Sequence, residues 1–122
     1  MEAKILLVDD DSLIHELLEA VLHGFNFSRA YNGREAIEIM RNEKIGLVIT
    51  DLQMPIMDGM ELCRSIREEY GRQLPVILCS GAGREIFPKE FDITSYFDEI
   101  IPKPIEIVIL RKKVNELLVK SC

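Results

Sequence analysis

Short apolar runs alternate with amphipathic stretches along the chain. Five runs have the length and composition of β-strands, at residues 5–8, 28–31, 47–50, from 75 onward and at 100–102. Between and after them, apolar residues recur at the three- and four-residue spacing of a helix. This alternation predicts an α/β fold in which a five-stranded parallel sheet carries helices on both of its faces.

Apolar stripes predict the first and last helices. The first helix should end at Gly24, and its stripe consists of Leu13, Ile14, Leu17, Leu18, Val21 and Leu22. Pro104 suits the first position of the last helix, where a missing N–H breaks no hydrogen bond. The stripe of that helix consists of Ile107, Leu110, Val114 and Leu117.

Two further helices are predicted from their N-terminal caps. Asn32 and Asp58 are each followed three residues later by a glutamate, Glu35 and Glu61. At this spacing the cap side chain and the glutamate can each accept a backbone N–H of the other residue. Apolar residues then recur at helical spacing, and Gly71 ends the second of these helices.

The segment from Arg84 to Glu99 is expected to contain at most a short helix. Pro88 and the β-branched residues Ile93 and Thr94 argue against a long uninterrupted one, so a total of five helices depends on this segment. It also holds half of the eight aromatic residues, which we interpret as core residues, with a partner-binding patch as the alternative. They are Phe87, Phe91, Tyr96 and Phe97.

Composition limits the classes of function. With 122 residues and 48% hydrophobic content, residues 1–122 are expected to form a single domain with one core. A net charge of −6 has the wrong sign for direct nucleic-acid binding, which depends on clustered cations. The amino-terminal apolar run is too short for a signal peptide or a membrane span.

The cysteines are odd in number and widely spaced, so we expect neither a disulfide framework nor a zinc site. They are Cys63, Cys79 and Cys122. The reducing cytoplasm is expected from this pattern, and a soluble protein from the short amino-terminal run.

Polar residues follow four of the predicted strands. Asp9 and Asp10 follow the first strand, Asp51 the third, Ser80 the fourth and Lys103 the fifth. Because the carboxyl ends of parallel strands meet at one edge, these side chains should converge there, where open α/β sheets bind ligands. Neighbouring carboxylates repel one another by roughly 4 kcal/mol per pair at 4 Å and an effective dielectric of 20, which calls for a bound cation.

These residue types fit a divalent metal and a phosphoryl group. A carboxylate can accept a phosphoryl group as an acyl phosphate, while a lysine and a hydroxyl stabilise charge on its oxygens. Asp51, alone at the middle strand, is the natural nucleophile, and Asp9 and Asp10 form a metal-holding pair suited to Mg²⁺. Taken singly, each residue has a structural explanation as a cap, turn or surface charge.

The chain resembles the receiver domains of two-component response regulators over nearly its whole length. The resemblance rests on four stretches in their order and spacing: Ile5 to Asp11, Asp51 to Gly59, Val76 to Ser80, and Lys103-Pro104. It implies the doubly wound, flavodoxin-like receiver fold, with a five-stranded parallel sheet of order 2-1-3-4-5.

The resemblance also implies a function. Asp51 would accept a phosphoryl group from the phosphohistidine of a sensor histidine kinase or a histidine phosphotransfer protein, and Lys103 and Ser80 would bind the acyl phosphate. Mg²⁺ would be held by Asp10, Asp51 and the backbone carbonyl of Gln53, with Asp9 acting mainly through water. The domain would be a switch that acts on a downstream protein target. It would catalyse only its own phosphotransfer and dephosphorylation, and would not otherwise be an enzyme. The bond before Pro104 is often cis in the family.

Two other functions are weighed against this one. Asp9 and Asp11 resemble the Asp-x-Asp signature of haloacid-dehalogenase-like phosphatases, with Asp9 as nucleophile and Asp11 as general acid. The short chain leaves no room for a cap domain, and that hypothesis has no use for the loop from Asp51 to Gly59. A pseudo-receiver that is never phosphorylated is the other alternative, because Ile100 stands where receivers commonly carry the Tyr or Phe of their switch.

Three smaller expectations concern the histidines, the methionines and the last helix. His15 and His23 lack a second histidine or cysteine at metal spacing, so both are predicted to be surface residues without a role. The methionines at 54, 57 and 60 are predicted to pack in the loop and core. Val108 and Ile109 add apolar surface outside the last stripe, which would allow a homodimer through that helix.

Overall fold

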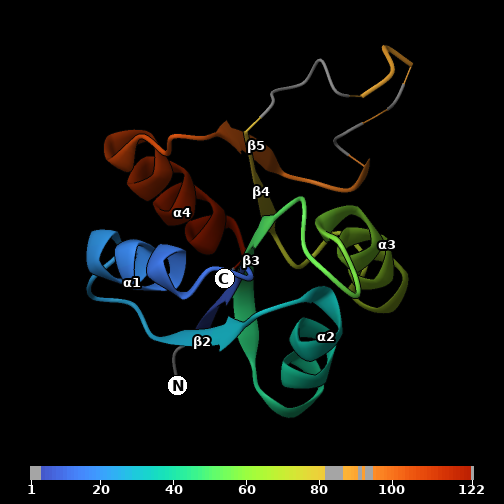
Figure 1. The fold of residues 1–122 in the computed structure, drawn as a ribbon, viewed down its shortest axis with the longest axis horizontal. Helices are drawn as coiled ribbons and strands as arrows, with labels where there is room; N and C mark the ends of the chain where they lie inside the picture. Colours follow the sequence, from blue (N-terminus) through green and yellow to red (C-terminus); the bar gives the residue numbers. More distant parts are fainter. Residues whose placement is uncertain (1–3, 82–86, 91, 93–94, 122) are drawn as a thin grey trace.

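The computed structural model describes residues 4–81, 87–90, 92 and 95–121, and for residues 119–121 the backbone alone. Its centre is a parallel sheet of five strands (Figure 1). The strands are β1 (Lys4–Val8), β2 (Phe27–Ala30), β3 (Ile45–Asp51), β4 (Val76–Ser80) and β5 (Glu99–Pro102). They lie in the order β2-β1-β3-β4-β5, so the predicted order is confirmed.

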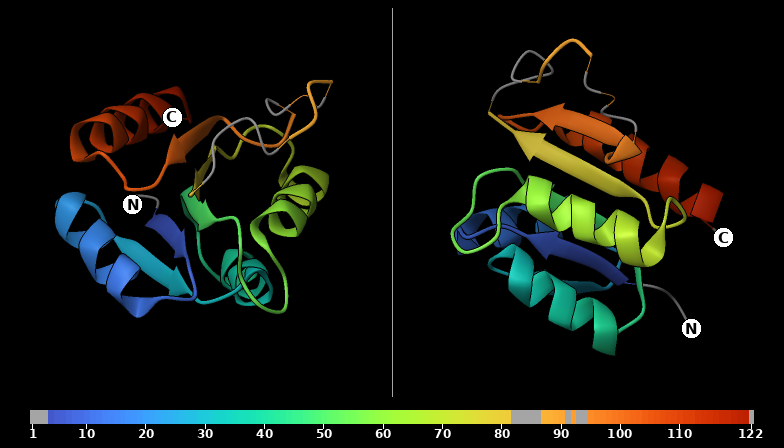
Figure 2. Two further views of the ribbon diagram at one scale, coloured as in Figure 1. Left: turned by 45° about the horizontal axis from the view of Figure 1, so that its top comes forward. Right: turned by 90° about the vertical axis from the view of Figure 1, so that its right-hand side faces the viewer.

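Two layers of helices enclose the sheet. The helices are α1 (Ser12–Val21), α2 (Gly33–Asn42), α3 (Gly59–Tyr70) and α4 (Ile107–Ser121). Figure 1 shows α1 and α4 on one face and α2 and α3 on the other, and the turned views of Figure 2 agree. The fold is therefore the three-layer arrangement that the alternating pattern predicts.

Alternating side chains of β1 supply both halves of the core. Ile5 and Leu7 pack with α1 and α4, whereas Leu6 and Val8 pack with α2 and α3, and all four are buried. This alternation follows from the two-residue period of a strand. Because β1 is covered on both faces, its sequence is a continuous apolar run that ends where the polar edge begins.

The predicted caps are present. The Asn32 side chain accepts the Glu35 N–H at 2.9 Å. Asp58 and Glu61 form the full reciprocal pair, with N···O distances of 2.8 and 3.2 Å. Asp11 caps α1 by accepting the Leu13 N–H at 2.9 Å. These caps determine the residue at which each of the three helices begins after its preceding strand.

The last helix begins later than predicted. Pro104 is not its first residue, because α4 starts at Ile107. The Lys103 N–H still donates to the Ser80 carbonyl at 2.8 Å, so the chain remains paired with β4 to that point. The Lys103–Pro104 bond is cis, as the family resemblance implies. Val108 is 74% exposed and Ile109 is exposed as well, while the homodimer stays a prediction.

The segment between β4 and β5 supports the core interpretation of its aromatic residues. Phe97 is buried, and Phe87 packs against it with ring centroids 6.1 Å apart. Tyr96 also packs against this core, whereas Phe91 lies outside the described residues. The described residues of this segment, 87–90, 92 and 95–98, contain no α-helix, and much of the predicted short helix falls outside them.

Cysteine and methionine side chains contribute to the core. Cys63 and Cys79 are buried free thiols, and Cys122 lies outside the described residues. Met54, Met57 and Met60 pack against the core, as predicted. Among the described residues, no helix is both long and apolar enough to cross a membrane.

Candidate functional site

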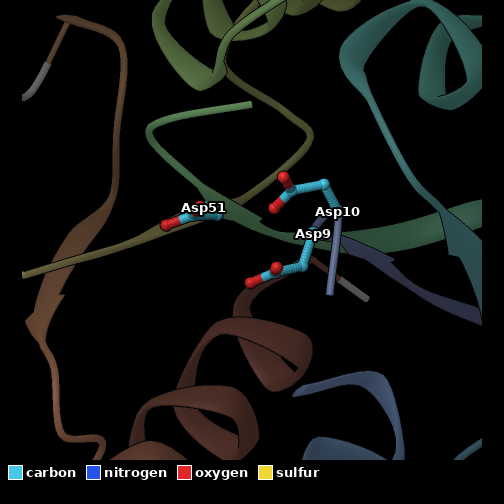
Figure 3. A group of neighbouring side chains, drawn as sticks. All are labelled: Asp9, Asp10 and Asp51. Carbon is cyan, nitrogen blue, oxygen red and sulfur yellow. The ribbon is translucent and has the colours of Figure 1, made fainter. Parts of the chain in front are cut away.

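Three carboxylates gather at the carboxyl edge of the sheet. Asp9 and Asp10 follow β1, and Asp51 is the last residue of β3. The two strands are neighbours, with Val8 opposite Thr50, so their ends bring the acids together. One oxygen from each carboxylate lies within 4.8 Å of the other two (Figure 3). This spacing suits a shared cation, as the sequence predicts.

Lys103 reaches this cluster from the far side of β4. Its Nζ lies 3.0 Å from Oδ1 of Asp51 and 3.6 Å from Oδ2 of Asp9. The residue directly follows β5, which is separated from β3 by β4. The hydrogen bond from its backbone N–H to Ser80 holds its main chain at the sheet edge. Lys103 is therefore held both by its backbone and by its side chain.

Ser80 and Gln53 lie beside the cluster on different elements. Ser80 is the last residue of β4, is buried, and stands one position beyond Cys79, which is opposite Asp51. Gln53 is an exposed residue of the loop after β3, two residues beyond Asp51. The five predicted side chains thus come to one edge, and the Gln53 carbonyl lies in the adjoining loop.

The charges of the cluster perturb one another. Burial raises the pKa of Asp9, and the nearby Asp51 and Asp10 carboxylates act in the same direction, against the Asp11 N–H and Lys103. Burial alone would lower the pKa of Lys103, but its hydrogen bond and charge contact with Asp51, aided by Asp9, raise it overall. Lys103 is therefore held in its charged form, whereas ionisation of Asp9 is disfavoured.

The loop between β3 and α3 is held tightly behind Asp51. The Gly59 N–H donates to the Leu52 carbonyl at 2.8 Å, and the Gly33 N–H donates to the Met57 carbonyl at 3.1 Å. The Met57 N–H donates to Pro55 O at 2.7 Å, which closes a γ-turn around Ile56 at φ 70°. This loop fixes the backbone on which Asp51 and Gln53 sit.

The prediction that His15 is a surface residue is wrong. His15 is fully buried, and its Nε2 lies 2.8 Å from the Asp9 carbonyl oxygen, whereas His23 is exposed as predicted. Within the predicted stripe, Leu13 and Leu17 are instead 69% and 50% exposed. The signal was present in the sequence, because position 15 lies three residues before Leu18 and seven before Leu22, on the buried face.

Comparison with known proteins agrees with this geometry. The family model of the response regulator receiver domain matches residues 5–115. The chain belongs to this family. It is 31% identical over 120 residues to the response regulator MprA of Mycolicibacterium vanbaalenii, covering 97% of this chain and 51% of that protein. The chain therefore spans about half the length of this curated relative.

Solved receiver domains have the same fold. The Francisella response regulator 1452 receiver domain superposes with a TM-score of 0.85 at 26% identity, covering 99% of this chain and all of that one. A CheY-like receiver domain protein from Methanospirillum hungatei JF-1 gives 0.86 at 27% identity, covering 99% and 97% of the two chains. The chain is thus a receiver domain homologous to two-component signalling proteins, and the comparisons do not favour the phosphatase.

Proposed function

We propose that this receiver domain accepts a phosphoryl group on Asp51. The donor would be the phosphohistidine of a sensor histidine kinase or a histidine phosphotransfer protein. The main support is the contact of 3.0 Å between Lys103 Nζ and Asp51 Oδ1, at an edge where two further carboxylates lie close by. An ammonium at this distance can stabilise the negative charge that moves onto phosphoryl oxygens.

The transfer uses Asp51 as nucleophile. A carboxylate oxygen of Asp51 bonds to phosphorus while the P–N bond to the donor imidazole breaks, so its electron pair leaves with the imidazole. The product is an acyl phosphate on the last residue of β3. The Ser80 hydroxyl at the end of β4 and Lys103 directly after β5 are the groups that would bind its oxygens.

The donor set fits Mg²⁺. Oxygen ligands are what this ion prefers, and it retains several waters in protein sites. Asp10, Asp51 and the Gln53 backbone carbonyl would hold it, with Asp9 acting mainly through water. Three carboxylates and one ammonium leave two negative charges, which a divalent cation balances. When bound, the ion would neutralise charge on the phosphoryl oxygens.

Phosphorylation would act as a switch through Lys103. This lysine contacts Asp51 through its side chain and Ser80 through its backbone. A phosphoryl group on Asp51 would therefore change the hydrogen-bond partners of Lys103 and of Ser80. Ile100, three residues earlier, pairs with β4 and packs against the core. The switch would therefore operate without an aromatic at this position, and it would alter affinity for a downstream protein target.

The phosphatase alternative lacks a free general acid. Asp11 is engaged as the N-cap of α1, and it is not part of the carboxylate cluster of the described residues. Asp9 is largely buried, with its Oδ1 accepting the Asp11 N–H at 2.9 Å. Both observations favour Asp51 as the nucleophile.

Intact-protein mass spectrometry after incubation with Mg²⁺ and acetyl phosphate tests this function. Wild-type protein should gain one phosphoryl group, and Asp51→Asn should gain none. Asp11→Asn is the matched control, because asparagine also caps a helix, and it should be labelled like wild type. Labelling lost in Asp9→Asn but kept in Asp51→Asn would support the phosphatase. Unlabelled wild type beside a labelled control receiver would identify a pseudo-receiver.

A further inference from the structure

His15 is a buried imidazole that contacts the backbone of the carboxylate cluster. It lies in α1, and its Nε2 is 2.8 Å from the carbonyl oxygen of Asp9. A carbonyl oxygen can only accept, so Nε2 must carry the hydrogen and donate it. The other ring nitrogen, Nδ1, is also buried and has no partner among the residues that the structure describes.

The unpartnered Nδ1 argues against a role in packing alone. Burying a polar atom without a hydrogen bond is unfavourable, and an apolar side chain of similar size would avoid this cost. Tyr31 packs against the ring, with centroids 4.8 Å apart. Arg29 contacts the Tyr31 side chain and is itself held by two hydrogen bonds to Glu19. The ring is therefore firmly oriented toward Asp9.

The bond from His15 completes a set of contacts around Asp9. The Asp9 N–H donates to the Ala30 carbonyl of β2 at 3.1 Å, and Oδ1 of Asp9 accepts the Asp11 N–H at 2.9 Å. The remaining backbone group of Asp9, its carbonyl, is the one that His15 holds. Because this carbonyl shares a rigid peptide plane with the Asp10 nitrogen, the bond also orients the start of Asp10.

We propose that His15 is a positioning residue for metal binding. By fixing the Asp9–Asp10 peptide plane it directs both carboxylates toward Asp51, where Figure 3 shows the three acids facing one region. Without the hydrogen bond from His15, the Asp9–Asp10 peptide plane could rotate. Binding of the ion would then have to order the two carboxylates, which weakens the affinity. This inference rests on the proposed Mg²⁺ site, and His15 itself does not touch the ion.

Isothermal titration calorimetry with Mg²⁺ on the full chain tests the proposal. Loss of a partner that orients metal ligands weakens metal binding by roughly tenfold or more, so His15→Leu should raise the dissociation constant by about that factor. His15→Gln should stay within about threefold of wild type, because its amide can donate from near the position of Nε2. His23→Leu, on the exposed histidine, is the matched control and should leave the dissociation constant unchanged.

Thermal melting in EDTA records whether each variant folds. Should His15→Leu fail to fold, His15→Asn takes its place, because its shorter amide does not reach the Asp9 carbonyl. Binding as tight as wild type in the variant without the donor would overturn the proposal. An equal loss in that variant and in His15→Gln would do so as well, since the ring rather than its hydrogen bond would then matter.

The failure of this inference is distinguishable from that of the proposed function. If wild-type protein neither binds Mg²⁺ nor takes up phosphate on Asp51, both are wrong. If wild type does both and His15→Leu binds Mg²⁺ equally well, only the role of His15 is wrong.

Discussion

Replacing Gly59 by alanine tests how closely the site depends on the loop behind it. Gly59 is the first residue of α3, and its backbone packs against the end of β3. An added Cβ would lie 2.2 Å from the Asp51 carbonyl oxygen and 3.0 Å from the Leu52 Cα. Both contacts are with backbone, so no side-chain rotation can relieve them. Either α3 or the chain that carries Asp51 must move.

The expected loss of stability is about 2 kcal/mol. Reaching an ordinary contact of 3.4 Å requires a displacement of about 1 Å, and such overpacking costs roughly 1–3 kcal/mol. The displacement also strains the hydrogen bond from the Gly59 N–H to Leu52, worth about 1 kcal/mol. Alanine returns up to about 1 kcal/mol through its higher helix propensity.

The same displacement should slow phosphorylation. A shift of about 1 Å at the backbone of a reacting group can cost on the order of a hundredfold in rate. Gly59→Ala should therefore lose rate with acetyl phosphate by at least about tenfold, measured by mass spectrometry at temperatures where the variant is folded. Because the close contact is with the backbone of the residue that carries the nucleophile, added Mg²⁺ should not restore the rate.

Urea unfolding followed by circular dichroism measures the stability. Gly81→Ala is the matched control, since a Cβ there would meet nothing within 4 Å, and it should change stability by less than about 0.5 kcal/mol. If Gly59→Ala proves as stable as this control, the close approach of α3 to Asp51 is not a constraint and the reasoning is refuted.

Three further predictions concern the cluster and its loop. Mg²⁺ should raise the melting temperature of wild type, and a rise of the same size in Asp10→Ala would contradict the metal assignment. Burial raises the pKa of Asp9, so its ionisation begins to destabilise the fold as the pH rises above the ordinary value of 3.8, and the loss is complete above the raised value. In EDTA, Asp9→Asn should unfold at higher urea than wild type at pH 7, and the difference should vanish below the ordinary pKa of 3.8; an unchanged difference would refute this. Ile56→Asn should gain about 1 kcal/mol in urea unfolding, because asparagine tolerates φ 70° better than a β-branched residue; any loss would contradict this.

The carboxylate cluster was predictable because strand ends are encoded locally. The apolar run of β1 stops at Asp9 and that of β3 at Asp51, and parallel pairing of the two strands then brings the acids together. The caps Asn32 and Asp58 were equally predictable, because each depends on a residue only three positions away. These strand ends and caps, set by short-range sequence, were thus predictable, whereas the first helix ends at Val21 and not at the predicted Gly24.

Features set by long-range contacts were not predictable. Pro104 has the residue type of a helix start, but backbone pairing of Lys103 with Ser80 delays α4 to Ile107. The spacing of His15 with Leu18 and Leu22 indicates the buried face, but a hydropathy pattern does not show its partner, the Asp9 carbonyl, which allows an imidazole inside the core. Leu13 has the spacing of the predicted stripe but is exposed, because the buried face of α1 is the one that carries His15 and Leu18.

Backbone hydrogen bonds anchor each part of the site to a different neighbour. Asp9 is bonded to β2 through Ala30, Lys103 to the end of β4, and the loop after Asp51 to Gly59 of α3. The positions of the charged groups therefore depend on the sheet and on the first residue of α3, and less on the solvent-facing sides of the helices. It follows that substitutions on the exposed faces of α1 or α4 should leave the three carboxylates and their lysine in place, even where they change how the domain binds other proteins.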